Sequence, residues 1–324
     1  MRPRYFALLL TAASVALAPL PGYAQSGDVP RTPWGRPDLQ GVWDFATLTP
    51  MERPAEFADR ATLTEEDVAN IVARSAQFTQ FLSENGIGSS DTRTGTYDEF
   101  WFDFGSDVSA DRRTALVVDP PTGRIPDLTP AARERQAARR AYLAEHPADS
   151  WEDRNLAERC LVGFNSGPPM APSAYNNVFQ LFQTEDHVVI LNEMVHDARI
   201  VPLDGRDGLD PRVRQWLGSS RGYWDGDTLV VETANFRDET NFRGVTRDVR
   251  LEERFTRAGD DTLLYRFTVN DPRTFERPWT AEVPMSLSSE PTFEYACHEG
   301  NYGLEGILAG TRAEERESAE SARD

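Results

Sequence analysis

The sequence predicts a mainly β fold with two or more helices, in which an antiparallel sheet curls into a barrel. Between residues 175 and 300, short segments of strand composition follow one another at close intervals. Turn dipeptides such as Asp204-Gly205 and Asp225-Gly226 separate them, and Asp-Gly between strands is the strongest short hairpin signal. Apolar residues alternate with polar ones within several segments, for example over 263–270. A long run of strands of this kind is typical of a barrel or a sandwich.

One strand and two helices are expected before this meander. Residues 38–46 have the composition of a first strand, whereas the segment from about 50 to 170 is helical and irregular. In the first predicted helix, Thr64 and Asp67 approximate a capping box, and apolar residues follow at helical spacing. The second predicted helix begins with a threonine at the cap and a proline at the first helical position, which helix starts prefer.

Residues 1–24 have the features of a secretory signal peptide. Arg2 and Arg4 precede an apolar run, and Gly22-Tyr23-Ala24 offers a small-residue cleavage site. The run is shorter than the ~20 residues that a membrane-spanning helix needs, although a retained N-terminal anchor is the alternative. We therefore expect the mature protein to be periplasmic or secreted, without stable membrane insertion.

The composition of the remaining chain limits its partners and its chemistry. We expect a single globular domain over residues 25–312 and a disordered tail over 313–324, where core-forming residues are lacking. The formal net charge of −19 disfavours nucleic acid and anionic membranes as partners. All 34 basic residues are arginine, which excludes Schiff-base chemistry and a phosphate-binding loop lysine. No dinucleotide fingerprint or haem motif occurs, so no cofactor is expected.

Several motifs resemble those of known protein groups. The stretches "TPWGRPDLQGVW", "GYWDGDTLVVETANF" and "YACHEGNYG" resemble a family of secreted or periplasmic bacterial proteins to which no activity is assigned. Gly41-Val42-Trp43 on the first predicted strand is similar to the Gly-x-Trp of lipocalins. This second resemblance implies a lipocalin-like (calycin-type) barrel. The two helices fall between the first strand and the meander, which departs from the usual lipocalin order.

The two cysteines, Cys160 and Cys297, are expected to form a disulfide. An isolated pair in an oxidising compartment usually does so. In the chain-entropy model, a disulfide that closes so long a loop stabilises the folded state by ~5 kcal/mol. The alternative is a nucleophilic pair between Cys297 and His298. Adjacent residues on a strand point to opposite faces, which is poor geometry for proton transfer between them.

A candidate acid–base site is predicted around His196, the histidine best placed inside the β-region. The predicted catalytic residues are His196, Glu193, Arg199, His298 and Glu299. The same histidines with Glu193 or Glu299 could hold a metal ion, but no HxH, HxxxH or HExxH spacing occurs, so no metal is expected. Whether His196 and His298 face one pocket is left open.

Aromatic and amide side chains supply the predicted substrate-binding residues, namely Tyr223, Trp224, Asn301 and Tyr302. The leading hypothesis is a periplasmic or secreted β-barrel protein that binds a small apolar or aromatic molecule in the barrel, with cofactor-free lyase, hydratase or isomerase activity if it is an enzyme. A carbohydrate-active enzyme with paired carboxylates is one alternative. A non-catalytic envelope protein is another. The sequence leaves the substrate, the reaction and the oligomeric state open.

Overall fold

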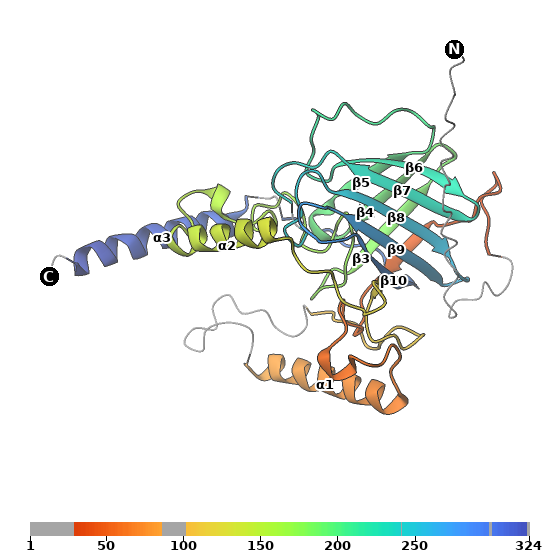
Figure 1. Cartoon of the computed structure of the whole chain (residues 1–324), viewed down its shortest axis with the longest axis horizontal. Coiled ribbons are helices and arrows are strands. Elements are labelled where there is room, and N and C mark those ends of the chain that lie inside the picture. Colours follow the sequence, from red (N-terminus) through yellow and green to blue (C-terminus); the bar gives the residue numbers. More distant parts are fainter. Residues whose placement is uncertain (1–28, 86–101, 241, 298–299, 323–324) are drawn as a thin grey trace, which may run out of the picture.

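The protein is built on one antiparallel sheet. The computed structural model describes residues 29–85, 102–240, 242–297 and 300–322, so the signal peptide predicted for 1–24 lies outside the described residues. The strands follow the order β5-β4-β3-β1-β10-β9-β8-β7-β6, and β2 also pairs with β10 (Figure 1). Their bounds are β1 Gly41–Asp44, β2 Val117–Asp119, β3 Val178–Gln183, β4 His187–Asn192, β5 Ala198–Pro202, β6 Ser219–Asp225, β7 Thr228–Ala234, β8 Arg250–Arg257, β9 Thr262–Asn270 and β10 Trp279–Ser288. The mainly β, antiparallel class is therefore confirmed.

The two edge strands of the sheet, β5 and β6, pack against each other without pairing. The sheet order ends at these strands, and no ladder joins them among the described residues. Gly222 of β6 lies so close to β5 that an added Cβ atom would be 3.0 Å from Val201 Cγ1 and 2.6 Å from Leu203 Cδ2 beyond it. The sheet is thus strongly curved but not closed, and the predicted barrel is not confirmed.

Large side chains fill the inside of the curved sheet. Residues alternate between the two faces along β8 and β9, and every second residue is buried. The largest fully buried side chains include Trp43, Phe179, Tyr265, Phe267 and Trp279. Phe267 and Trp279 meet edge to face at 5.7 Å, a favoured arrangement for aromatic rings. The interior is therefore a packed core.

Hydrogen bonds fix the segment that precedes β1 to the sheet. The Leu39 backbone N–H donates to Gln183 Oε1 at 3.0 Å, and Gln183 Nε2 donates to the Pro37 carbonyl at 3.1 Å. The Trp43 indole N–H donates to the Leu39 carbonyl at 2.9 Å. The Arg257 guanidinium lies 4.9 Å from the Trp43 ring centroid, within the range of a cation–π contact. Trp43 therefore joins the segment that precedes β1 to the core.

The two predicted helices are present with the expected caps. They are α1 (Glu65–Asn85) and α2 (Pro130–Glu145). At α1 the Thr64 N–H donates to Asp67 Oδ2 at 2.8 Å, and the Asp67 N–H donates to Thr64 Oγ1 at 3.1 Å. At α2, Thr129 Oγ1 accepts from the Ala132 N–H at 3.2 Å. Within the described ranges, short 3₁₀ helices lie in the connections at Ala55–Phe57, Trp151–Asp153 and Met194–His196.

A third helix replaces most of the predicted disordered tail. α3 (Tyr302–Ser321) begins at Asn301, whose side chain accepts from the Leu304 N–H at 3.3 Å. None of its described residues is buried, and the alanine, glutamate and arginine of its second half favour a helix through intrinsic propensity. Composition without core-forming residues suggested disorder over 313–324, but such residues can still form an exposed helix. Figure 1 shows α2 and α3 extending away from the sheet.

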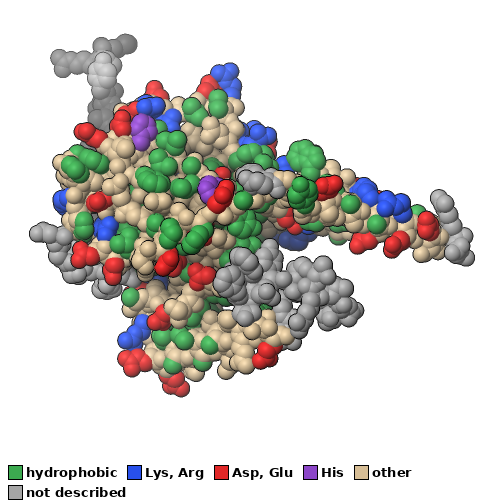
Figure 2. Space-filling model, turned by 180° about the vertical axis from the view of Figure 1, so that it is seen from behind, with side chains coloured by type: hydrophobic (Ala, Val, Ile, Leu, Met, Phe, Trp, Pro, Cys, Tyr) green, Lys and Arg blue, Asp and Glu red, His purple; other side chains and the backbone are tan. Residues whose placement is uncertain are grey.

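The surface carries charges of both signs. Figure 2 shows acidic and basic side chains interspersed over one face of the sheet and along the helical extension. Among the described residues, no helix is both long and apolar enough to cross a membrane.

Candidate functional site

An open groove lies beside the disulfide and is called here the disulfide groove. Its volume is about 930 Å³. One wall comes from residues 155–164, Tyr175 and the turn between β4 and β5, and the other from residues 295–297 and the first turns of α3. Aromatic side chains line both of its walls. Concave sites with aromatic walls are where proteins usually bind small molecules.

The disulfide between Cys160 and Cys297 forms part of the groove's lining. The S–S bond is 2.06 Å long, the Cα atoms are 5.5 Å apart, and 137 positions separate the two cysteines. The predicted disulfide is therefore confirmed. Because Cys297 is bonded to Cys160, it cannot act as the nucleophile of a Cys297–His298 pair. His298 and Glu299 themselves lie outside the described residues.

Aromatic rings run along the groove. Phe164 meets Tyr175 edge to face at 5.2 Å, and Tyr175 stacks with Tyr295 at 6.5 Å. Tyr302, at the start of α3, is 78% exposed. The structure thus brings Tyr302 and Asn301, two of the predicted binding residues, to one groove. Phe164, Tyr175 and Tyr295 were not among the predicted residues.

The amide and carboxylate groups in the groove are engaged within the protein. Asn301 Nδ2 donates to the Glu158 carbonyl at 3.0 Å, while its Oδ1 caps α3. The Glu158 carboxylate pairs with Arg154 at 2.6 Å. Recognition in the groove would therefore depend on ring contacts and shape more than on these polar groups.

The backbone around the groove is strained. Cys160, Val195 and Asn301, which line it, have φ angles of 54°, 63° and 34°. The neighbouring His196 has a φ of 62°. Positive φ is unfavourable for these residue types and most of all for β-branched valine, and such strain clusters at functional sites. Three non-glycine residues with positive φ angles therefore line this one groove.

The three predicted catalytic residues that the structure describes, His196, Glu193 and Arg199, do not converge on one point. His196 is exposed, directly after Val195. Glu193 is buried and braces other segments: it accepts from Asn176 Nδ2 at 2.6 Å and from the Phe293 N–H at 2.9 Å. Arg199 projects from β5 into the interior. Of these three residues, Glu193 and Arg199 therefore lie in internal contacts, and His196 is accessible.

Arg199 forms a buried ion pair with Glu253 of β8. Arg199 Nη2 donates to Glu253 Oε1 at 2.9 Å, and Nη1 donates to Oε2. The Tyr265 hydroxyl also donates to Glu253, at 2.8 Å, and accepts from the Met170 N–H at 3.0 Å. Burial and the Glu253 charge raise the pKa of Tyr265 well above its usual value, which keeps the hydroxyl protonated as a donor. Burial alone would lower the pKa of Arg199, but attraction to Glu253 outweighs it and raises that pKa.

Tyr223 and Trp224 lie elsewhere, on β6. Neighbouring strand residues point to opposite faces, so Tyr223 is 47% exposed while Trp224 packs against the core. The Arg36 guanidinium lies 5.4 Å from the Trp224 ring centroid. Neither residue lines the disulfide groove.

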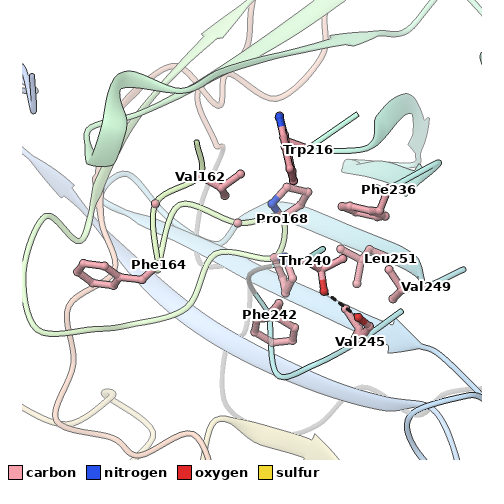
Figure 3. A pocket seen from close by; sticks show the side chains of 13 residues that line it. Val162, Phe164, Pro168, Trp216, Phe236, Thr240, Phe242, Val245, Val249 and Leu251 are labelled. Carbon is pink, nitrogen blue, oxygen red and sulfur yellow. Dashed lines mark hydrogen bonds between the residues drawn. The ribbon is translucent and has the colours of Figure 1, made fainter. Parts of the chain in front are cut away.

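A smaller apolar crevice adjoins the groove (Figure 3). It has a volume of only about 30 Å³ and is lined by side chains such as Trp216, Phe236 and Phe242. Thr240 Oγ1 donates to the Val245 carbonyl at 2.7 Å, drawn as a dashed line in Figure 3. Phe164 lines both hollows. The crevice has room for a methyl group or a water molecule and not for a ring.

The described residues contain no group of three or more His, Cys, Asp or Glu side chains arranged to hold a metal ion. Comparison of the chain with family models, curated proteins and solved structures finds no match.

We predict that replacing His196 with glycine raises the free energy of unfolding by about 0.5 kcal/mol. A left-handed conformation costs an L-residue roughly 1–2 kcal/mol, and the entropic cost of glycine offsets about half of that gain. Urea unfolding followed by tryptophan fluorescence measures the change. His187, which has no positive φ and starts β4, is the control: His187→Gly should lower the free energy by about 1 kcal/mol. Equal destabilisation by both would contradict the assignment of strain to His196.

Proposed function

We propose that the protein binds a small apolar or aromatic molecule in the disulfide groove. The observation that carries this proposal is the row of rings from Phe164 through Tyr175 to Tyr295 beside a strained backbone. A neutral ligand with one or more rings suits it best, because the nearby amide and carboxylate groups already have partners. The packed interior of the sheet supports a ligand site outside it.

The setting that we propose is the periplasm or the extracellular space. A disulfide supports an oxidising compartment. As scaffold we propose a lipocalin-like, calycin-type barrel, which the close contact of Gly222 with β5 supports. Membership of the secreted bacterial family named above is likewise a proposal that rests on the quoted motifs.

Three other functions would follow from different outcomes at the same groove. If the bound molecule is turned over without a cofactor, we propose His196 as the acid–base group, because it follows Val195 in the groove wall. A carbohydrate-active enzyme is less well supported. Glu158 is the one carboxylate in the groove's described lining, and it is paired with Arg154. A non-catalytic envelope protein would follow if nothing binds.

A neutral fluorescent probe tests the proposal. We expect N-phenyl-1-naphthylamine to bind saturably, and Tyr295→Ala to weaken its affinity by about three- to tenfold, since an aromatic contact is worth roughly 0.5–1.5 kcal/mol. Tyr223→Ala is the matched control, because this tyrosine is exposed on β6 and should leave the affinity unchanged.

Native mass spectrometry of protein purified from the periplasm would show whether a natural ligand is retained. A probe that does not saturate, or that responds equally to both tyrosine variants, would contradict binding in the groove. Unchanged binding and turnover in His196→Ala would remove the acid–base role from His196.

A further inference from the structure

The outer face of the sheet is apolar over β1 and β3–β5. Along β3, β4 and β5, inward side chains are buried and the side chains between them point outward. The strand register sets the outward side chains in rows, so that Phe182, Val189 and Ile200 lie opposite one another. The apolar face is defined here by six outward side chains, Val42, Phe182, Val189, Leu191, Ala198 and Ile200.

The apolar face is open to solvent and carries no charge in its middle. Ile200 is 63% exposed and Phe182 is 42% exposed. Gln180 is the polar side chain among these rows, and its Oε1 accepts from Thr292 Oγ1 at 3.4 Å. The titratable side chains of these strands, Asp44 and His187, stand at opposite ends of the face. Figure 2 shows hydrophobic side chains gathered over the middle of the sheet on the rear side of the molecule.

The outer face of β8 and β9 has the opposite character. Its outward residues include Arg250, Glu252 and Arg254 on β8 and Arg266 on β9. Polar outward residues are normal where one face of an antiparallel sheet meets water. The apolar face is therefore an exception within the same sheet, and exposed apolar patches of this kind mark interaction sites.

A second copy of the chain matches the chemistry of the apolar face. A face without charged side chains needs no opposite charge on its partner, so the same face of another copy complements it in a two-fold dimer. Two sheet faces pack about 10 Å apart, with their strands within about 30° of each other. An anionic membrane fits less well, because the formal net charge of −19 opposes its approach.

The size of the apolar face determines how strong the contact is. Strands β3 and β4 are each 6 residues long. At about 3.3 Å per residue and about 4.8 Å between strands, β1 and β3–β5 span a face of roughly 20 Å by 20 Å. Two copies would together bury roughly 800 Å², which is below the ~1,200 Å² at which stable complexes begin. The area therefore fits a weak, reversible dimer.

We propose that the protein forms a weak two-fold dimer in which the apolar faces of two copies pack against each other. Ile200 and Phe182, its most exposed members, form the centre of the contact. The formal net charge of −19 on each copy opposes this association, and salt screens the repulsion beyond ~8 Å at physiological ionic strength. The dimer therefore strengthens as salt is raised, whereas a contact made of ion pairs would weaken.

Sedimentation velocity of the whole protein tests the proposal. We expect the weight-average mass to rise towards that of a dimer between about 10 µM and about 1 mM, the range of weak complexes. Ile200→Arg and Phe182→Arg should each weaken association at least tenfold, because the two-fold contact then brings two like charges together. Both side chains are exposed, so the variants should fold as the wild type does. Leu264→Arg is the matched control: it makes the same kind of change on the outer face of β9 and should leave association unchanged.

Three results would overturn the proposal. The first is a protein that stays monomeric at about 1 mM in about 0.5 M NaCl, where charge repulsion is screened. The second is a dimer that neither Ile200→Arg nor Phe182→Arg weakens, which would place the contact on another face. The third is a monomer that binds neutral phosphatidylcholine vesicles and loses this binding in Ile200→Arg, which would assign the apolar face to a membrane surface.

Discussion

Replacing Arg199 with methionine should lower the free energy of unfolding by about 3–5 kcal/mol, because it leaves the carboxylate of Glu253 buried without its counter-ion. Glu253 is 0% exposed and Arg199 is 5% exposed, so water cannot replace the guanidinium. The Tyr265 hydroxyl would remain as one donor to Glu253, which is not enough to neutralise a buried charge. Urea unfolding at neutral pH, followed by tryptophan fluorescence, measures the loss.

The control is an ion pair on the outer face of the same sheet. Arg254 of β8 pairs with Asp225 at 2.6 Å, and the two side chains are 30% and 61% exposed. Arg254→Met should cost no more than about 1 kcal/mol, as exposed ion pairs do. The double variant Arg199→Met/Glu253→Met should recover most of the loss, since paired removal leaves no unpaired charge. Equal effects of Arg199→Met and Arg254→Met would contradict the buried ion pair.

The Arg199–Glu253 pair shows what strand periodicity can and cannot predict. Glu253 lies between the buried Leu251 and Phe255 on β8, and this alternation predicts a buried carboxylate. Its partner lies 54 positions away on β5. The spacing of residues along the sequence cannot predict the contact between Arg199 and Glu253, because β5 and β8 meet only through the curvature of the whole sheet. Arg199 was therefore predicted as a catalytic residue, although its side chain pairs with Glu253 inside the protein.

The strands were predictable because each carries its own signal. Alternation and Asp-Gly turns are local, and they correctly predicted the antiparallel meander. Closure of the sheet depends on the register and tilt of all its strands, which no local pattern records. The contact of Gly222 with Val201 and Leu203 is a consequence of that global geometry. For the same reason the sequence could not distinguish a closed barrel from an open, curved sheet.

The candidate site was predictable only in its C-terminal half. Asn301 and Tyr302 stand in a conspicuous motif, and the structure places both in the disulfide groove. Phe164 and Tyr175 lie in an irregular segment without periodicity, so no pattern predicted their position. His196 and Glu193 are close in sequence but belong to a tight turn, where φ angles of 63° and 62° at two successive residues turn neighbouring side chains in different directions.

Trp43→Ala should lower the free energy of unfolding by about 3–5 kcal/mol, the range measured for large aromatic truncations in cores. The ring is 0% exposed and lies under the Arg257 guanidinium at 4.9 Å. Its indole N–H holds the Leu39 carbonyl at 2.9 Å. The substitution therefore creates a cavity in the core and removes the hydrogen bond that holds the segment preceding β1. Urea unfolding and hydrogen exchange of residues 31–40 would measure the two effects separately.

Trp34 provides the matched control within the same N-terminal segment. It is 36% exposed and lies outside the core, so Trp34→Ala should cost less than about 1 kcal/mol. Trp43→Phe should fall between the two, because a phenyl ring fills most of the space but cannot donate to the Leu39 carbonyl. If Trp43→Ala were no more costly than Trp34→Ala, the Gly-Val-Trp strand would not anchor the core. The lipocalin-like scaffold that this motif implies would then lose its main support.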